Sequence, residues 1–220
     1  MKKIFLVAAL AVFTSSAFAQ LLTGKSASLA KEESRNWSYL YLQYNAGTFN
    51  GDVNSKYLTL DGTYNGFSFG YNMDFRLTDA IPLFLETGIA GQISLSEIDF
   101  PLGGKADFTM LSAKIPLGVS YVFDIPNTPI SIIPNAGFDF RINALAQLDF
   151  DGAGDIDLFD KEDMLGSDNT WDRFQVGAHI GANVRFWKKL LLGVNYQFDF
   201  NEIGPDTSLG QVNLTVGLCF

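Results

Sequence analysis

The amino-acid sequence predicts an all-β protein, an eight-stranded antiparallel up-and-down transmembrane β-barrel. Eight segments alternate large apolar residues with small or polar residues at period two, the pattern of strands with two different environments. The connections between these segments are alternately short and long, as in barrels with short turns on one side of a membrane and long loops on the other. After residue 19 the chain has no run of about 20 apolar residues, so only a closed barrel could span a membrane.

The first residues have the form of a secretory signal peptide. Two lysines precede an apolar run over residues 4–13, and residues 17–19 (Ala-Phe-Ala) form a small-x-small cleavage site. The alternative, a membrane anchor, would need a longer apolar run. We therefore expect residues 1–19 to be cleaved, 20–36 to form a flexible extension with a short helix as the alternative, and 37–220 to form the barrel.

Charge and cysteine content exclude several classes of partner and cofactor. Removing Lys2 and Lys3 from a chain of formal charge −9 leaves −11, which disfavours nucleic acid. Cys219 is the only cysteine, so there is no disulfide framework and no thiolate pair for a metal. We expect no cofactor and no resident metal ion.

The first four strands are expected over residues 37–47, 67–75, 83–95 and 111–123, joined by a loop (48–63), a short connection (76–82) and a second loop (96–107). Pro116 removes a ladder donor from the fourth strand, so we expect a bulge or local irregularity there. Their apolar faces are Leu40, Leu42, Tyr44 and Ala46; Phe67, Phe69, Tyr71, Met73 and Phe75; Leu83, Leu85, Ile89, Ile93 and Leu95; and Leu111, Ala113, Ile115, Leu117, Val119, Tyr121 and Phe123.

The last four strands are expected over residues 130–148, 174–186, 192–200 and 212–220, with short turns at 124–129 and 187–189 and long loops at 150–172 and 201–210. The fifth strand is longer than a membrane requires, so its far end should stand above the bilayer. Their apolar faces are Ile130, Ile132, Pro134, Ala136, Phe138, Phe140, Ile142, Ala144, Ala146 and Leu148; Phe174, Val176, Ala178, Ile180, Ala182, Val184 and Phe186; Leu192, Val194, Tyr196, Phe198 and Phe200; and Val212, Leu214, Val216, Leu218 and Phe220.

The apolar faces are expected to point outward, into lipid. A soluble ligand-binding barrel would turn them inward, but eight strands enclose only enough space for side chains of modest size. The polar faces of the second, fourth and last three strands carry few charges, whereas a soluble surface would have roughly a quarter to a third. Those charges are Asp74, Lys114, Arg185 and Asp199.

Several short motifs resemble the porin-family outer-membrane β-barrel domain of Gram-negative bacteria. They are Lys114-Ile115-Pro116-Leu117-Gly118-Val119-Ser120-Tyr121, Ile133-Pro134-Asn135-Ala136-Gly137, Ile180-Gly181-Ala182, Leu191-Leu192-Gly193-Val194-Asn195-Tyr196 and the closing strand that ends in Phe220. The resemblance covers residues 37–220 and implies a small outer-membrane protein surrounded by outer-membrane lipid and lipopolysaccharide. It also implies periplasmic chaperones and the barrel-assembly machinery as partners during biogenesis, with Phe220 in the assembly signal. It implies no particular activity, and the porin label implies a channel that an eight-stranded member need not have.

A set of charged residues is expected inside the barrel. Such charges are costly in a membrane unless they are paired or hydrated, so we expect salt bridges across the lumen. A narrow hydrated path for small solutes is the alternative. The set is Asp74, Glu86, Lys114, Asp139, Arg141, Arg185 and Asp199.

Two further features suggest chemistry but have simpler explanations. His179, the only histidine, could carry protons, yet it lies on the face opposite the lipid-facing row. The single Gly-x-Ser-x-Gly match, Gly66-Phe67-Ser68-Phe69-Gly70, lies in an expected strand and so does not form a nucleophile elbow. We therefore expect no catalytic residue, with a lipid-modifying enzyme as the rival class. The acidic loop 150–172 lacks the ligand spacing of a calcium site, so we expect a solvated loop.

The sequence therefore favours a monomeric outer-membrane barrel with a structural or surface-interaction role and four loops outside the cell. A narrow passive channel is the alternative. Trp37, Trp187 and Tyr121 lie near strand ends and are expected in the aromatic girdles at the membrane interfaces.

Overall fold

The fold is described from a computed structural model of the chain, which describes residues 36–51, 62–99, 105–150, 154–161 and 170–220. Residues 36–220 form one compact unit. The predictions of a signal peptide and a flexible extension fall on residues outside the described ranges, except for Asn36. No helix in the described ranges is long and apolar enough to cross a membrane.

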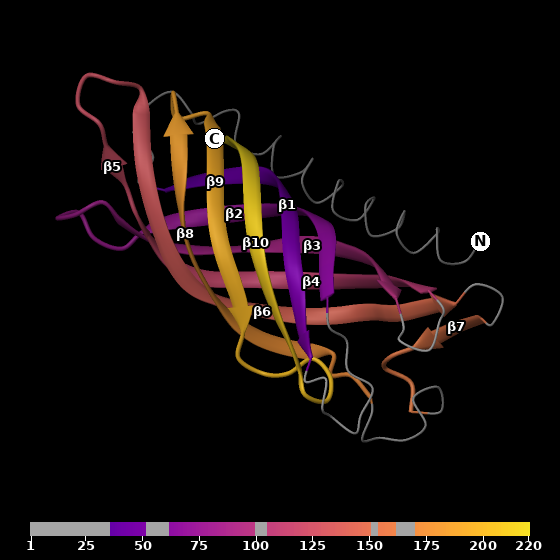
Figure 1. Cartoon of the computed structure of the whole chain (residues 1–220). Coiled ribbons are helices and arrows are strands. Elements are labelled where there is room, and N and C mark those ends of the chain that lie inside the picture. The colour runs from indigo at the N-terminus through magenta and orange to yellow at the C-terminus, as the bar shows by residue number, and fades with distance from the viewer. Residues whose placement is uncertain (1–35, 52–61, 100–104, 151–153, 162–169) are drawn as a thin grey trace, which may run out of the picture. The chain divides into compact units, whose positions relative to one another are not determined.

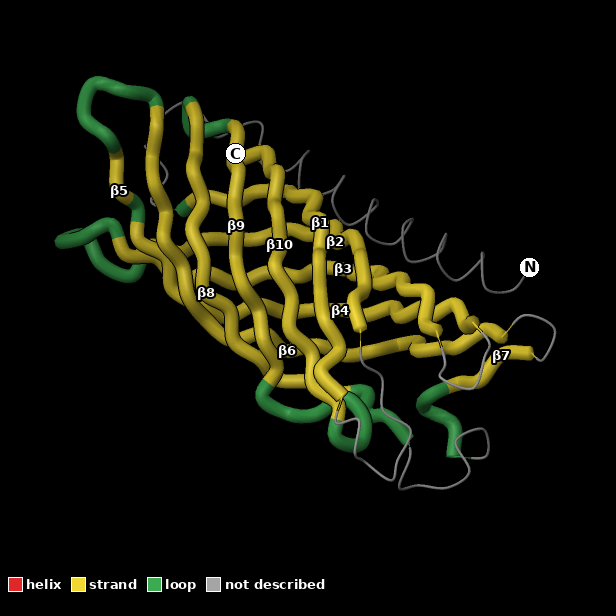
Figure 2. The backbone as a smooth tube through the Cα atoms, viewed as in Figure 1, coloured by secondary structure: helices red, strands yellow, loops and turns green. Residues whose placement is uncertain are grey.

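The described chain forms one antiparallel sheet of ten strands (Figure 1; Figure 2). The short strands β5 and β7 pair only with β6, and the other eight close a barrel because β1 pairs with both β2 and β10 while β4 pairs with β6. The predicted eight-stranded up-and-down barrel is confirmed. The strands are β1 (Trp37–Gly51), β2 (Gly62–Arg76), β3 (Leu83–Asp99), β4 (Lys105–Tyr121), β5 (Phe123–Asp124), β6 (Ile130–Phe150), β7 (Gly154–Asp157), β8 (Phe174–Phe186), β9 (Leu190–Asp199) and β10 (Thr207–Cys219).

The two ends of the barrel differ in their connections. At one end, here called the short-turn end, residues 77–82, 125–129 and 187–189 join neighbouring strands, and the chain reaches Phe220. At the other, the long-loop end, lie the connections after β1, β3, β6 and β9. Figure 1 shows β5 and the C-terminus at the short-turn end and β7 at the opposite end.

The apolar rows face outward, as predicted. Leu42 is 63% exposed, whereas the next residue along β1, Gln43, is 5% exposed. Phe67 is likewise 59% exposed. Because the same alternation runs through every long strand, the barrel has an apolar outer band and a polar interior, the reverse of a soluble ligand-binding barrel.

Several strands continue further toward the long-loop end than the sequence predicted. β1 reaches Gly51, β4 begins at Lys105 and β10 begins at Thr207, and the four-residue strand β7 lies within the acidic segment expected to be a loop. In these extensions the faces are inverted, with apolar residues inside and polar residues outside. Phe49 and Phe108 are each 1% exposed. The loop boundaries predicted at 48–63, 96–107, 150–172 and 201–210 were therefore wrong in part.

A β-bulge occurs in the long strand β6, but not where the proline predicted it. The β4–β6 register shifts between Leu111 and Ser112, which leaves Ala144 unpaired on β6. Pro116 pairs in register with Asp139 on β6, but the ladder toward β3 is interrupted there, so the predicted local irregularity at Pro116 is present although the bulge lies elsewhere. The bulge reverses the faces beyond it, because an extra residue shifts the alternation by one.

Because the faces of β6 are reversed beyond the bulge, two residues were predicted on the wrong face. Ala146 and Leu148 were expected on the lipid face, yet both are fully buried inside the barrel.

Candidate functional site

The seven charged side chains singled out from the sequence all point into the lumen. They come from β2, β3, β4, β6, β8 and β9, so they line most of the wall. Each is nearly inaccessible to solvent. The set is Asp74, Glu86, Lys114, Asp139, Arg141, Arg185 and Asp199.

Among the described residues, an ion pair and a carboxylate–histidine contact bridge strands inside the lumen. Arg141 on β6 forms an ion pair with Asp199 on β9, across the intervening strand β8. Nδ1 of His179 lies 2.9 Å from Oδ2 of Asp139. Both pairs are almost completely buried, and a buried charge is strongly destabilising when its partner is lost.

The remaining carboxylates are held by neutral donors. Ser120 donates a hydrogen bond of 2.6 Å to Asp74. Glu86 accepts hydrogen bonds from Asn72, at 2.7 Å, and from the Tyr39 hydroxyl, at 3.2 Å. The predicted salt bridges therefore account for only part of the network, because hydroxyl and amide groups satisfy the other carboxylates.

Amide side chains complete the network, and the sequence analysis did not single them out. Lys114 on β4 donates to Gln197 on β9, at 3.1 Å, and Gln211 on β10 donates to the same Gln197 oxygen, at 3.0 Å. Gln92 on β3 donates to Gln211, at 3.1 Å. This chain of hydrogen bonds joins opposite walls of the barrel. The signal that could have found it is the repeated Asn and Gln on the inward-facing rows, such as Asn45.

A small polar cavity remains in the middle of the lumen. Its volume is about 40 Å³, and its lining includes Tyr41, Glu86, Lys114, Asp139 and His179. A cavity needs roughly 10–15 Å³ to hold one water molecule, so this space suits only a few waters.

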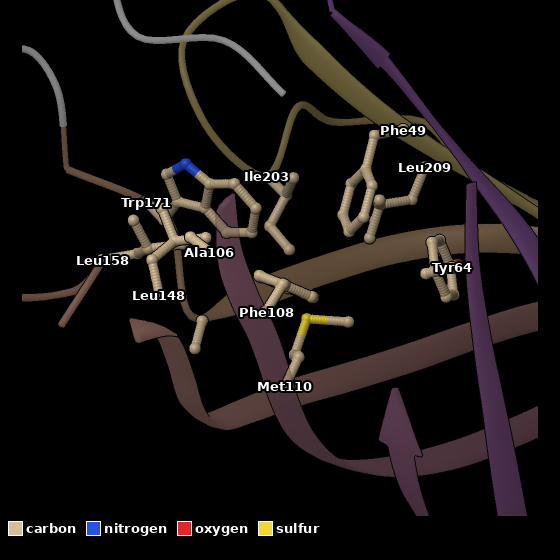
Figure 3. Close-up of a cluster of buried hydrophobic side chains, with 11 residues drawn as sticks. Phe49, Tyr64, Ala106, Phe108, Met110, Leu148, Leu158, Trp171, Ile203 and Leu209 are labelled. Atoms are coloured by element: carbon tan, nitrogen blue, oxygen red, sulfur yellow. The ribbon is translucent and has the colours of Figure 1, made fainter. Parts of the chain in front are cut away.

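Above the polar network the lumen is closed by apolar side chains, here called the apolar cap (Figure 3). Trp171 packs against the rings of Phe49 and Phe108, with centroids 6.2 and 5.8 Å away, and those two rings meet edge to face. Both the barrel strands and the loops contribute side chains to the apolar cap, so the loops are packed into the mouth of the barrel. The members are Phe49, Tyr64, Ala106, Phe108, Met110, Ala146, Leu148, Leu158, Trp171, Ile203 and Leu209.

The short-turn end of the lumen is narrowed by Trp37. Its ring stacks on Tyr39, with centroids 5.2 Å apart, and the guanidinium of Arg185 lies 4.7 Å above it. Trp37 therefore faces the lumen, and the prediction that it belongs to an interfacial girdle was wrong. The alternation that places Tyr39 inside places Trp37 inside as well.

No metal centre is formed by the part of the chain that the structure describes. Within those ranges no three His, Cys, Asp or Glu side chains come together as metal ligands. Part of the acidic loop considered for calcium, residues 151–153 and 162–169, lies outside the described ranges.

Comparison with solved structures finds several similar chains. Neisserial surface protein A is 15% identical, with 83% of this chain and 97% of that chain covered and a TM-score of 0.50. Ail, the attachment invasion locus protein of Yersinia pestis, solved with the heparin analogue sucrose octasulfate, is 16% identical, with 84% and 99% covered and a TM-score of 0.44. The outer membrane enzyme PagL is 11% identical, with 80% and 97% covered and a TM-score of 0.42. At 15% identity, the likeness to Neisserial surface protein A shows the fold alone.

A search of curated proteins finds no significant match. The model of one protein family, described as the outer membrane protein beta-barrel domain, matches residues 5–220. The match spans the whole barrel, and with the closed sheet and its apolar outer band it shows that this chain belongs to the outer membrane protein beta-barrel domain family.

Proposed function

We propose that this protein is a closed outer-membrane barrel with a structural or surface-interaction role, and that it presents its four long loops outside the cell. The observation that carries the proposal is the filled lumen. Packed apolar side chains close the long-loop end, and hydrogen bonds join opposite walls below them. A barrel whose described lumen residues are packed in this way is suited to holding its loops in place rather than to passing solutes.

The strand extensions beyond the lipid-facing band support the proposed surface-interaction role of the long-loop end. Outward residues there are polar, such as Thr48 and Thr63, while the inward ones form the apolar cap. This part of the wall is therefore built like a soluble β-barrel standing in water. Leu158, Trp171 and Ile203 join the loops to it, so the loops have a fixed base.

The narrow channel remains the second candidate because of the polar cavity. A conducting path would have to pass the cross-lumen link from Lys114 to Gln197 and then the apolar cap. The hydrogen-bonded link and the apolar cap would need to open at the same time. We propose that the resting barrel does not conduct.

We also propose that the barrel is not an enzyme. Its only histidine, His179, contacts Asp139 in the lumen, where no lipid acyl chain reaches. Among the described residues, no serine or threonine hydroxyl donates a hydrogen bond to His179, and a nucleophile activated by this base would need that contact. Incubation of the purified barrel with lipid A tests this point, because release of free fatty acid would contradict it.

Planar-bilayer recording of the purified barrel tests the main proposal. We expect no stable single-channel conductance from the native chain. Arg141→Met and Lys114→Met test whether the charged network is the barrier, and we expect both variants to stay closed because the apolar cap remains. Stable channels in the native protein would overturn the proposal in favour of the channel.

The orientation is tested by labelling in intact cells. Cys219 is buried, and a Cys219→Ser background removes it altogether. Asp160→Cys places a thiol at the long-loop end, and Ala80→Cys places one in a short turn; both positions are exposed. A maleimide that cannot cross the outer membrane should label position 160 in intact cells and position 80 only after the membrane is disrupted. The reverse pattern would show that the long loops face the periplasm.

A further inference from the structure

Asp74 and Glu86 lie directly opposite each other inside the barrel. They are register partners on β2 and β3, and both point into the lumen, so their β-carbons are about 4.5–5.5 Å apart. Asp74 is 1% exposed and Glu86 is 6% exposed. Two ionised carboxylates at this separation repel each other, and the repulsion is stronger in a buried site than in water.

Neither carboxyl group has a cation beside it to offset this repulsion. Among the residues that the structure describes, Asp74 and Glu86 form no ion pair. The basic side chain at this end of the lumen, Arg185, has its guanidinium over the ring of Trp37, at 4.7 Å, rather than against a carboxylate. A buried charge without a partner is strongly unfavourable, so the pair has reason to carry less than two negative charges.

The two carboxyl groups also differ in the donors that reach them. Oε1 of Glu86 accepts hydrogen bonds from Asn72, at 2.7 Å, and from the Tyr39 hydroxyl, at 3.2 Å. Oδ1 of Asp74 accepts one, from Ser120, while its Oδ2 is buried and has no donor among the described groups. Because donors stabilise the charged form of a carboxyl group, the contacts favour an ionised Glu86 and a neutral Asp74.

The lumen holds more carboxyl groups than basic side chains. The contact between His179 and Asp139 needs no extra charge, because the neutral imidazole can donate through Nδ1. With His179 neutral, one bound proton would therefore make the positive and negative groups equal in number. The described inward-facing carboxyl groups are Asp74, Glu86, Asp139 and Asp199, and the basic side chains are Lys114, Arg141 and Arg185.

We propose that Asp74 and Glu86 form a proton-binding site, and that at neutral pH the pair holds one proton, on Oδ2 of Asp74. The proton removes the repulsion between the two groups and changes the unpartnered oxygen from an acceptor into a donor. The barrel takes this proton from water when it folds and returns it when it unfolds. The site goes beyond the proposed surface role, and it is independent of which way the long loops face.

Other ionisable groups face the pair from the strands packed around it. Of these, only histidine ordinarily changes its charge between about pH 5 and 8. The contribution of His179 is present in the native chain and in variants of Asp74 alike, so a comparison of the two isolates the carboxyl pair. The facing groups are Tyr39 and Tyr41 on β1, Lys114 on β4, Asp139 on β6, His179 and Arg185 on β8, and Cys219 on β10.

The pH dependence of unfolding counts the bound protons. A carboxyl group in an unfolded chain loses its proton at about pH 4, so between about pH 5.5 and 7 only the folded barrel holds the Asp74 proton. Each proton that only the folded state binds raises the unfolding constant about tenfold per pH unit, so this stability is lost as the pH rises. In phosphatidylcholine vesicles, the native chain should therefore show a dependence about tenfold per pH unit steeper than that of D74N.

The control for that experiment makes the same chemical change on the surface. D107N replaces an exposed aspartate of β4 and should keep the native dependence on pH. Equal dependences in the native chain and D74N would overturn the proposal, because the folded barrel would then hold no proton at Asp74.

Infrared absorption detects the proton directly and needs no variant to do so. A protonated carboxyl group has a carbonyl band above the amide bands, and this band shifts in heavy water. Lipid esters absorb nearby, so the barrel is held in an ester-free detergent. The native chain should show the band at neutral pH, and D74N should lack it. In E86Q the band should disappear at a lower pH than in the native chain, because Asp74 no longer faces a negative charge. Absence of the band from the native chain, or its persistence in D74N, would contradict a proton on Asp74.

Discussion

Gly204 lies directly against the indole of Trp171, the central ring of the apolar cap. A β-carbon on Gly204 would come within 2.4 Å of Nε1 of Trp171 and 2.5 Å of Cδ1. The backbone carbonyl of Ile203, the residue before Gly204, accepts a hydrogen bond from the amide of Asp172, at 2.6 Å. The two loops that close the barrel are therefore fitted to each other through a position where only glycine has room.

Gly204→Ala should loosen the cap. The added methyl group must displace the indole from its contacts with Phe49 and Phe108, and overpacking of this kind costs about 1–3 kcal/mol. Urea unfolding of the reconstituted barrel measures the loss. Gly91→Ala is the matched control, because a β-carbon there meets nothing within 4 Å, and it should change stability by less than about 0.5 kcal/mol. Equal stabilities for the two variants would mean that the cap is not packed as described.

The buried ion pair of Arg141 with Asp199 should matter mainly through the charge left behind when one partner is removed. Arg141→Met leaves Asp199 buried without its cation, which costs roughly 3–5 kcal/mol. Removing both charges, in Arg141→Met with Asp199→Leu, should recover most of that loss. The free energy of unfolding of the four proteins in a double-mutant cycle is the measurement. A double variant as unstable as the single one would show that the pair supports the lumen in some other way.

The outward face of β1 allows a direct test of the lipid-facing band. Leu42 and Thr48 lie on the same face of one strand, six residues apart, which is about 20 Å along the strand. Leu42→Arg should destabilise the barrel in bilayers by about 2–4 kcal/mol, because its charge lies among acyl chains. Thr48→Arg, beyond the apolar band, should cost less than about 1 kcal/mol. A similar cost at both positions would mean that the band does not end where the outward residues become polar.

The barrel could be predicted from the sequence because the lipid outside it and the polar interior together impose one simple rule on each strand. Within the lipid band, each outward residue must be apolar and each inward residue small or polar, so strands such as Phe67–Phe75 are plain from periodicity alone. Beyond the band the rule reverses, with Phe49 and Phe108 inside the barrel. A search for outward apolar rows therefore took those segments for loops.

The interior was less predictable than the wall. Charged residues on the inward rows were easy to find, but their partners depend on which strands face each other across the lumen. Gln92 contacts Gln211 because the closed barrel places β3 opposite β10, and no local pattern contains that information. The bulge shows the same limit. Pro116 was the residue predicted to disturb the strand pairing. The residue that the bulge leaves unpaired with β4 is Ala144, and the residues around it carry no turn or proline signal.

Leu148 provides a test of that bulge. If the alternation of β6 continued without a break, Leu148 would face outward and its truncation would cost little. The shifted register places it inside the apolar cap, fully buried, so Leu148→Ala should cost about 2–5 kcal/mol through lost contacts and a residual cavity. Ile142→Ala is the control, because Ile142 precedes the bulge and is 55% exposed on the outer face. Unfolding of both variants in the same vesicles gives the comparison, and a larger loss for Ile142 than for Leu148 would place the shift elsewhere in the strand.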